Sequence, residues 1–242
     1  MGTVALLEIE GLRKDFGGLA AVDGVDFALA EGDLHALVGP NGCGKSTLFN
    51  LITGALPPSG GRVRFAGEDI TGWPAWRIAR AGIGRKFQVP AVFDELTVLE
   101  NLALPRWAAA RLPMLARADL APRNDLARLH LAGKSAVRAG ALSHGERQWL
   151  EIGMLLAANA RLLLLDEPTA GMTQGETVAT AGLIRRVAGA ATVLVIEHDI
   201  GFIEALACPV TVMAKGRILC SGSFAEIRAD ARVHELYFGR AA

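Results

Sequence analysis

The sequence has few cysteines, few aromatic residues and no excess of either charge. Its 25 lysine and arginine residues balance 25 aspartate and glutamate residues, so the formal net charge is zero. Proteins that bind nucleic acid mainly by releasing counterions need a basic surface, so this balance argues against a nucleic-acid partner. The three cysteines form no Cys-x-x-Cys pair. That spacing argues against a disulfide framework or a zinc cluster, and free thiols suit a reducing cytosol.

Long apolar runs are also missing, although the chain is apolar overall. The hydrophobic fraction is 51% and the mean hydropathy is +0.32, yet a membrane-spanning helix needs about 20 mostly apolar residues in a row. The longest charge-free stretch, residues 46–61, contains three glycines and two prolines. The N-terminus has no basic region before its apolar residues, as a secretory signal would. We expect no bilayer span, so the apolar residues fill an α/β core or form a face that docks on an apolar partner.

Three kinds of segment follow one another along the chain. Residues 1–87 contain strand-like runs separated by glycine turns, whereas residues 88–158 are rich in alanine, leucine and arginine at helical spacing. Uniform apolar runs, which are typical of parallel strands buried on both faces, occur later at Leu162–Leu165, Thr192–Ile196 and Val210–Ala214. The pattern predicts one domain over 1–242, in which a helical lobe (88–158) interrupts an α/β core (1–87 and 159–242).

The most specific motif is Gly-x-x-x-x-Gly-Lys-Ser, which follows a short apolar strand and precedes an apolar helix. Its glycines let successive backbone N–H groups and a helix N-terminus face a phosphate. Lys45 adds a positive charge for the β- and γ-phosphates, and the Ser46 hydroxyl can bind Mg²⁺. The strand–loop–helix context disfavours the alternative, an ordinary glycine-rich turn. The predicted nucleotide-binding residues are Gly39, Pro40, Asn41, Gly42, Cys43, Gly44, Lys45, Ser46 and Thr47.

A second motif consists of four leucines followed by Asp166, Glu167 and Pro168. Burying carboxylates at the end of an apolar strand is costly unless a cation or hydrogen bonds compensate. Asp166 therefore suits a Mg²⁺ shell, and Glu167 suits a base that takes a proton from an attacking water. The alternative is a strand that simply ends at a solvated acidic turn. The glycine-rich loop upstream favours the catalytic interpretation.

A third motif, Leu-Ser-His-Gly-Glu-Arg-Gln at residues 142–148, precedes an apolar helix. A hydroxyl, a glycine for close approach and a helix N-terminus make another anion receptor, although a lone Ser-x-Gly before a helix is usually only a cap. Its place about 20 residues before the acidic strand resembles the signature peptide of ATP-binding cassette (ABC) ATPases. The resemblance covers nearly the whole chain. Phe16 matches the aromatic that stacks on adenine, Gln88 the Q-loop glutamine and His198 the switch histidine, although each alone could be an ordinary structural residue.

The resemblance implies an α/β fold: a P-loop NTPase (RecA-like) core with an N-terminal antiparallel β-subdomain and an inserted α-helical subdomain that carries the signature at its end. It implies an ATPase that uses ATP and Mg²⁺. It also implies a head-to-tail dimer with a second ATPase subunit, either another copy of this chain or a paralogue. Ser143, Gly145 and Glu146 would then contact the ATP that the partner's P-loop holds, in place of an arginine finger.

Roles within one site also follow from the resemblance. Glu167 would be the general base, His198 would contact the γ-phosphate and hold the water, and Gln88 would couple Mg²⁺ to the helical lobe. The metal ligands would be Ser46, Gln88 and Asp166.

Three positions depart from the family pattern. His144 replaces the more usual glycine of the signature, and Glu146 stands where glutamine is common. Thr173 occupies the place of the D-loop aspartate of many members, which puts the usual cross-dimer contact there in doubt. Cys43 inside the P-loop raises the hypothesis of oxidation sensitivity.

Several segments narrow the resemblance to the ATPases of hydrophobic-amino-acid-type importers. They read GRKFQ, VFDELTVLENL, LSHGERQWLEIGMLL, LLLLDEPTAGMT and EHDIGFI, and they are most similar to the urea-importer branch. This likeness implies ATP-driven uptake of a small polar solute, urea or a short amide, with branched-chain amino acids as the alternative. The implied partners are transmembrane permease subunits and, indirectly, a solute-binding protein, with no nucleic acid. The implied location is peripheral, on the cytoplasmic side of the cell inner membrane.

An apolar stripe follows Gln88 and has two interpretations, internal packing of the lobe or a groove for a permease helix. Its members are Val89, Val92, Phe93, Leu96, Val98 and Leu99.

Other classes fit less well. Chromosome and DNA-repair ATPases of this type need a long coiled coil between P-loop and signature, and no sustained heptads occur there. Translation factors of the ABC type carry two cassettes, whereas this chain has one P-loop. A GTPase would need an Asn-Lys-x-Asp-like base reader, and an ATP-binding scaffold without turnover would be expected to lose Glu167 or His198. A soluble ABC ATPase not tied to transport stays open, and co-purification with a permease would discriminate.

Overall fold

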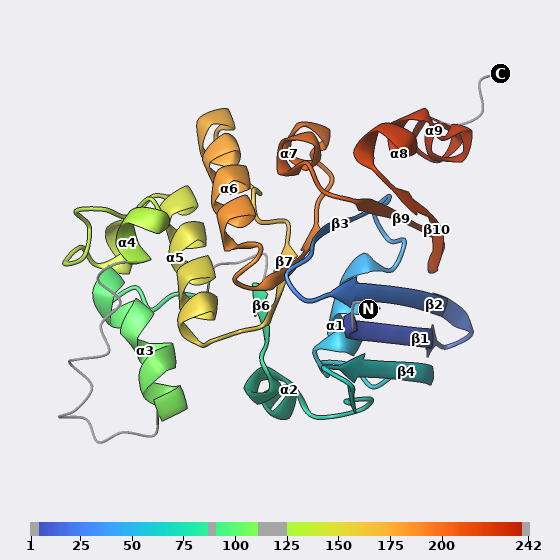
Figure 1. Cartoon of the computed structure of the whole chain (residues 1–242), viewed down its shortest axis with the longest axis horizontal. Coiled ribbons are helices and arrows are strands. Elements are labelled where there is room, and N and C mark those ends of the chain that lie inside the picture. The colour runs from blue at the N-terminus through green and yellow to red at the C-terminus, as the bar shows by residue number, and fades with distance from the viewer. Residues whose placement is uncertain (1–4, 87–90, 111–124, 239–242) are drawn as a thin grey trace.

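The computed structural model describes residues 5–86, 91–110 and 125–238, which build two β-sheets flanked by helices (Figure 1). The first sheet is antiparallel and contains β1 (Ala5–Phe16), β2 (Leu19–Ala30), β4 (Gly60–Phe65) and β5 (Glu68–Asp69). The second sheet contains β3 (Leu34–Val38), β6 (Ile83–Lys86), β7 (Leu162–Asp166), β8 (Thr192–Ile196), β9 (Val210–Ala214) and β10 (Arg217–Gly222). The order of its strands is β10-β9-β3-β8-β7-β6, and only the β9–β10 pair is antiparallel.

Strands β7, β8 and β9 of the second sheet are buried almost throughout, as the uniform apolar runs predict. Every residue of β7 and of β8 is buried. Side chains alternate along a strand, so Leu162 and Leu164 lie in one hydrophobic core and Leu163 and Leu165 lie in the other. The first core also holds residues of α1 (Lys45–Ile52) and of the antiparallel sheet, and the second holds residues of α5 (His144–Ala157) and α6 (Gln174–Val187).

Three strands of the second sheet end at the same edge. Asp166 on β7 is in register with Ile196 on β8, which is in register with Leu37 on β3. In open parallel sheets, ligands bind outside the carboxyl ends of the strands. The loops that follow β3, β7 and β8 are therefore the elements to inspect for a site.

The remaining helices lie around this core (Figure 1). They are α2 (Ala75–Ala81), α3 (Val98–Ala110), α4 (Asp125–Arg128), α7 (Ile200–Leu206), α8 (Phe224–Ala229) and α9 (Ala231–Phe238), with a 3-10 turn at Ala139–Ala141. Within the described ranges, no helix combines the length and the apolar character that crossing a bilayer requires.

The apolar stripe near the start of α3 divides between core and surface. Val98 is fully buried and Val92 packs partly against the core, whereas Phe93 is 55% exposed. Leu96 and Leu99 are half-buried, and Val89 lies outside the described residues. Part of the stripe thus packs the helical lobe, and Phe93 is left at the surface.

Candidate nucleotide-hydrolysis site

The glycine-rich loop connects β3 to α1, and two of its glycines are required by close backbone contacts. Gly44 has φ of +107°, and a Cβ there would lie 2.2 Å from the Ala21 carbonyl oxygen. Gly39 has φ of +154°, and a Cβ there would lie 2.1 Å from the Met213 carbonyl oxygen. Because only glycine fits these positions, the loop packs closely onto β2 and β9 and directs its backbone toward the start of α1.

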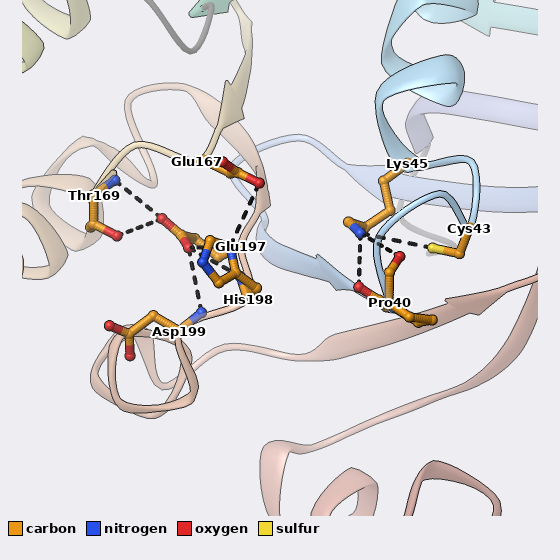
Figure 2. Close-up of polar contacts among 9 residues, drawn as sticks. Pro40, Cys43, Lys45, Glu167, Thr169, Glu197, His198 and Asp199 are labelled. Atoms are coloured by element: carbon orange, nitrogen blue, oxygen red, sulfur yellow. Dashed lines mark hydrogen bonds and ion pairs between the residues drawn. The ribbon is translucent and has the colours of Figure 1, made fainter. Parts of the chain in front are cut away.

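Lys45 is buried inside this loop, with 8% of its surface exposed. Its Nζ donates hydrogen bonds to the carbonyl oxygens of Gly39 at 2.8 Å and Pro40 at 3.1 Å, and lies 3.8 Å from Cys43 Sγ (Figure 2). These contacts hold the ammonium group at the centre of the loop. A phosphate that bound the backbone N–H groups of such a loop would meet this charge directly.

Cys43 is poorly suited to react with oxidants in the folded chain. Only 4% of the residue is exposed, and burial raises the pKa of its thiol despite the nearby Lys45 ammonium. The thiolate is the reactive form, so a raised pKa and low exposure both oppose oxidation. Cys43 therefore fits the role of a small residue in the loop.

One cavity joins the glycine-rich loop to the acidic strand. Its volume is about 360 Å³, and it lies at the carboxyl edge of the second sheet. Its lining residues are Ala21, Asn41, Gly42, Gly44, Lys45, Ser46, Thr47, Glu167 and Ile196. The fold thus brings Glu167 to the same cavity as the loop lysine and hydroxyls, as the sequence predicts. Phe16 is outside this lining; it ends β1, is 47% exposed, and has the Lys14 ammonium 5.2 Å from its ring centroid.

Asp166 is a buried carboxylate with one oxygen available for a cation. It is 3% exposed, and the Arg85 guanidinium donates to its Oδ2 at 3.0 Å. Its Oδ1 is buried and accepts no hydrogen bond from the part of the chain that the structure describes. Mg²⁺ prefers oxygen ligands and usually takes one or two carboxylates together with phosphates of the substrate. The Asp166 Oδ1 and the Ser46 hydroxyl therefore fit the Mg²⁺ that the sequence predicts.

Glu167 follows β7 in an unusual backbone conformation. Its φ is +46°, in the left-handed region that costs a residue with a side chain about 1–2 kcal/mol, and its N–H donates to the Ile196 carbonyl oxygen at 2.9 Å. Strain of this kind persists where the surrounding structure enforces it, often at functional sites. Here it turns the carboxylate away from the line of the strand, toward the cavity that Glu167 lines.

His198 lies beside Glu167 at the end of β8 (Figure 2). Its Nδ1 is 3.6 Å from Glu167 Oε1 and 3.8 Å from Glu197 Oε2, and its side chain is 62% exposed. Glu197 is 1% exposed and accepts hydrogen bonds from the Thr169 N–H at 3.1 Å, the Thr169 hydroxyl at 2.6 Å and the His198 N–H at 3.0 Å. Glu197 thus ties the loop after β7 to the loop after β8.

The signature segment begins α5 with a capping box. The Ser143 hydroxyl accepts a hydrogen bond from the Glu146 N–H at 3.2 Å, and Glu146 Oε2 accepts one from the Ser143 N–H at 3.0 Å. Burial acts to raise the pKa of Glu146, but contacts with Lys134 and Ser143 outweigh it and leave the pKa below its usual value. The structure therefore shows the Glu146 carboxylate engaged within its own helix start.

The signature segment also contacts the loop that follows Glu167. His144 Nε2 lies 2.9 Å from the Ala170 carbonyl oxygen. A Cβ on Gly145 would lie 2.5 Å from Glu176 Oε1, so the Glu176 side chain at the start of α6 lies directly over this glycine. His144, a departure from the family pattern, thus holds the signature segment against the loop that follows β7.

Thr173, another of the three departures from the family pattern, is the N-cap of α6. Its hydroxyl accepts from the Glu176 N–H at 3.3 Å, and Glu176 Oε2 accepts from the Thr173 N–H at 2.9 Å. Aspartate also makes a good N-cap. Threonine at this position therefore caps the N-terminus of α6 as an aspartate would.

Replacing Thr173 tests this capping role. Thr173→Ala is expected to lower the free energy of unfolding by about 1 kcal/mol, whereas Thr173→Asp is expected to change it by less than about 0.5 kcal/mol, because aspartate caps as well as threonine does. Urea denaturation followed by circular dichroism measures both. An alanine variant as stable as the parent chain would show that the cap contributes nothing.

The structure brings most of the predicted residues to one edge of the sheet. The P-loop, Asp166, Glu167 and His198 gather there, whereas Ser143 and Gly145 lie at the start of α5, outside the cavity lining. Gln88 lies outside the described residues. Arg85 and Glu197 carry no role in the sequence interpretation, although both are charged residues at buried strand ends and that placement is a usable signal.

A P-loop between a strand and a helix, with an acidic pair two strands away across β8, defines a P-loop nucleotide hydrolase. Residues 22–170 match the family model described as ABC transporter. The chain is 35% identical to the high-affinity branched-chain amino acid transport ATP-binding protein BraF of Pseudomonas aeruginosa and 33% identical to LivG of Escherichia coli, with 98% of each chain covered. It is also similar to the solved ADP conformation of an ABC transporter cassette, with a TM-score of 0.83, 31% identity and coverage of 98% and 100%.

The chain belongs to the ABC transporter family. It is an ATPase of that family and uses ATP with Mg²⁺. The cassette fold, with an antiparallel β-sheet, an α/β core and a helical part, confirms the predicted fold class. The likeness to the urea-importer branch is not confirmed, because the relatives named above belong to branched-chain amino acid transport.

Proposed function

We propose that this ATPase powers the uptake of branched-chain or related apolar amino acids as the peripheral subunit of an importer. Similarity over 98% of the chain to proteins named for branched-chain amino acid transport carries the proposal. In such an importer the chain would bind transmembrane permease subunits on the cytoplasmic side of the inner membrane, and a solute-binding protein would act indirectly. Phe93, exposed near the start of α3, is a candidate for the permease contact.

The geometry supports a separate role for each residue of the site in binding and hydrolysing ATP. The P-loop N–H groups and Lys45 would bind the β- and γ-phosphates, with Phe16 against the base. Glu167 would take a proton from the attacking water as its oxygen forms a bond to the γ-phosphorus, while the bond to the bridging oxygen breaks and ADP departs. His198, 3.6 Å from Glu167, would hold the water and the γ-phosphate.

The remaining predicted residues would complete the site. Ser46, Gln88 and Asp166 would hold Mg²⁺, which when bound neutralises charge that develops on the phosphates. Ser143 and Gly145 would contact the ATP of a second ATPase subunit in a head-to-tail dimer. Removal of the γ-phosphate contacts after hydrolysis would let such a dimer open.

Urea or a short amide is the second candidate solute. It rests on the likeness of two segments to the urea-importer branch, Trp149–Met154 after the signature and Thr169–Met172 after the catalytic strand. Neither segment would touch the solute, because this subunit acts on ATP. A soluble ABC ATPase that is not tied to transport is the alternative class.

ATPase stimulation by solute tests these candidates. The complex of this chain with its permease, in vesicles that contain the solute-binding protein, is expected to hydrolyse ATP several-fold faster with leucine, isoleucine or valine. Urea and acetamide are expected to have no effect. The reverse pattern would support the urea candidate, and failure to co-purify with any permease would support the soluble alternative. Vesicles with Glu167→Gln control for contaminating ATPases.

A further inference from the structure

Strand β6 places two consecutive cations on opposite faces of the second sheet. Arg85 extends to the face that packs on α1, where it donates to Asn50 Oδ1 at 2.5 Å and to Asp166 Oδ2 at 3.0 Å. Side chains alternate along a strand, so Lys86 extends to the face that packs on α5. There its Nζ lies 4.0 Å from Glu151 Oε2. The end of the catalytic strand therefore has a cation on each side.

Lys86 is fully buried, which is rare for lysine. Its side chain has no exposed surface, and that of Glu151 is 5% exposed. A buried cation persists only where opposite charges compensate for the lost hydration. Burial lowers the pKa of Lys86, and the carboxylates of Glu151, Asp166, Glu197 and Glu167 act against that shift, with Glu151 the strongest.

This ion pair lies between the strand that precedes Glu167 and the helix that begins at the signature segment. Lys86 is in register with Leu165, the residue before Asp166. Glu151 lies on α5 about two turns after Ser143, which caps that helix. The pair therefore spans the junction between the signature helix and the strand that carries the acidic residues. Three buried carboxylates, those of Glu151, Asp166 and Glu197, lie in this region together with the buried Lys86 and the largely buried Arg85.

We propose that Lys86 is a positioning residue for ATP hydrolysis, which holds the signature helix α5 against the end of β7 through Glu151. Without it, the buried Glu151 carboxylate would lose the cation 4.0 Å away, and the unfavourable buried charge would displace the end of β7 and with it Glu167. The glycine-rich loop would be spared, because it packs on backbone atoms of β2 and β9 and places Cys43 in the core on the α1 side of the second sheet, whereas Lys86 faces α5. The inference does not depend on which solute is transported.

A charge-neutral double variant separates this role from simple packing. Lys86→Met is expected to lower kcat for ATP by ten-fold or more while KM stays within two-fold, because catalysis is disturbed and binding is not. Removing the partner charge as well, in Lys86→Met/Glu151→Gln, is expected to raise kcat at least three-fold above that of Lys86→Met. The reason is that the buried Glu151 carboxylate, which loses its lysine in the single variant, is then replaced by a neutral amide. Activities are measured per folded, ATP-binding chain at saturating Mg²⁺. Arg161→Met, which breaks an exposed ion pair with Glu31, is the control and should keep parental kcat.

Several outcomes would overturn the proposal. Parental kcat in Lys86→Met would do so, and so would a double variant no more active than the single one. If Lys86→Met does not fold, Glu151→Gln and the double variant carry the test. The double variant must then fold. Glu151→Gln must also lower kcat by at least three-fold with KM unchanged. Parental kcat in Glu151→Gln would reject the positioning role.

Discussion

Glu167→Gln is expected to lower kcat for ATP hydrolysis by a factor of about 10²–10⁴ while ATP still binds. Glutamine has nearly the same shape but its amide cannot accept the proton of the attacking water. The residue after β7 would keep its backbone conformation, because the hydrogen bond from its N–H to Ile196 does not involve the side chain. Since Glu167 lines the same cavity as Lys45 and Ser46, the loss is expected in turnover and not in affinity.

Two measurements check this expectation. ATP affinity by equilibrium binding should be within a few-fold of the parent chain. ATP should also shift the variant to a larger species in size-exclusion chromatography, because the closed dimer that we propose would be unable to hydrolyse its nucleotide. Glu31→Gln is the matched control, since Glu31 is exposed and pairs with Arg161 on the surface. Rapid turnover by Glu167→Gln would refute the assignment of Glu167 as general base.

The centre of the second sheet could be predicted from the sequence because β7 and β8 are buried on both faces. Leu162–Leu165 has no polar alternation, and such a run is typical of a parallel strand. The partition of these leucines between two cores could not be predicted. It depends on which elements cover each face. Helices α5 and α6, which flank β7 in the chain, cover one face, whereas α1 and the antiparallel sheet, which cover the other, come from a distant part of the chain.

The site could be predicted where one local motif carries the chemistry. The glycine-rich loop is such a motif, and steric contacts at Gly39 and Gly44 explain why glycine is needed there. Contacts between segments far apart in the chain could not be predicted. The ion pair of Lys86 with Glu151 and the contact of His144 with Ala170 belong to this kind.

Glu146 shows how a motif residue can have a local role that the motif does not reveal. Its position suggests contact with a nucleotide, whereas its carboxylate completes the capping box with Ser143 and meets Lys134. The spacing Ser-x-x-Glu, which is a signal for such a box, is present at residues 143–146. The structure shows this local capping role, and contact of Glu146 with a partner's nucleotide stays a prediction.

Lys45→Ala is expected to weaken ATP binding by about 10- to 150-fold. A hydrogen bond to a charged group contributes about 1.5–3 kcal/mol. Lys45 is a buried cation of the loop, and the other phosphate ligands that we propose there are backbone N–H groups. The loop loses the hydrogen bonds from Lys45 to the Gly39 and Pro40 carbonyls, but it should keep its shape, because Gly39 and Gly44 also pack against backbone atoms of β9 and β2. Turnover should fall as well, since the lost charge also faces the γ-phosphate.

Thermal stability measured with and without ATP distinguishes lost binding from lost folding. At an ATP concentration 100 times the Kd of the parent chain, binding stabilises the folded state by about 2.7 kcal/mol. A 100-fold weaker Kd reduces that stabilisation to about 0.4 kcal/mol at the same concentration, so the ATP-induced rise in Tm should nearly vanish in Lys45→Ala. Lys215→Ala, at an exposed lysine in the turn before β10, should keep the full rise. An undiminished rise in Lys45→Ala would contradict the binding role, because it would show that the backbone alone holds the phosphates.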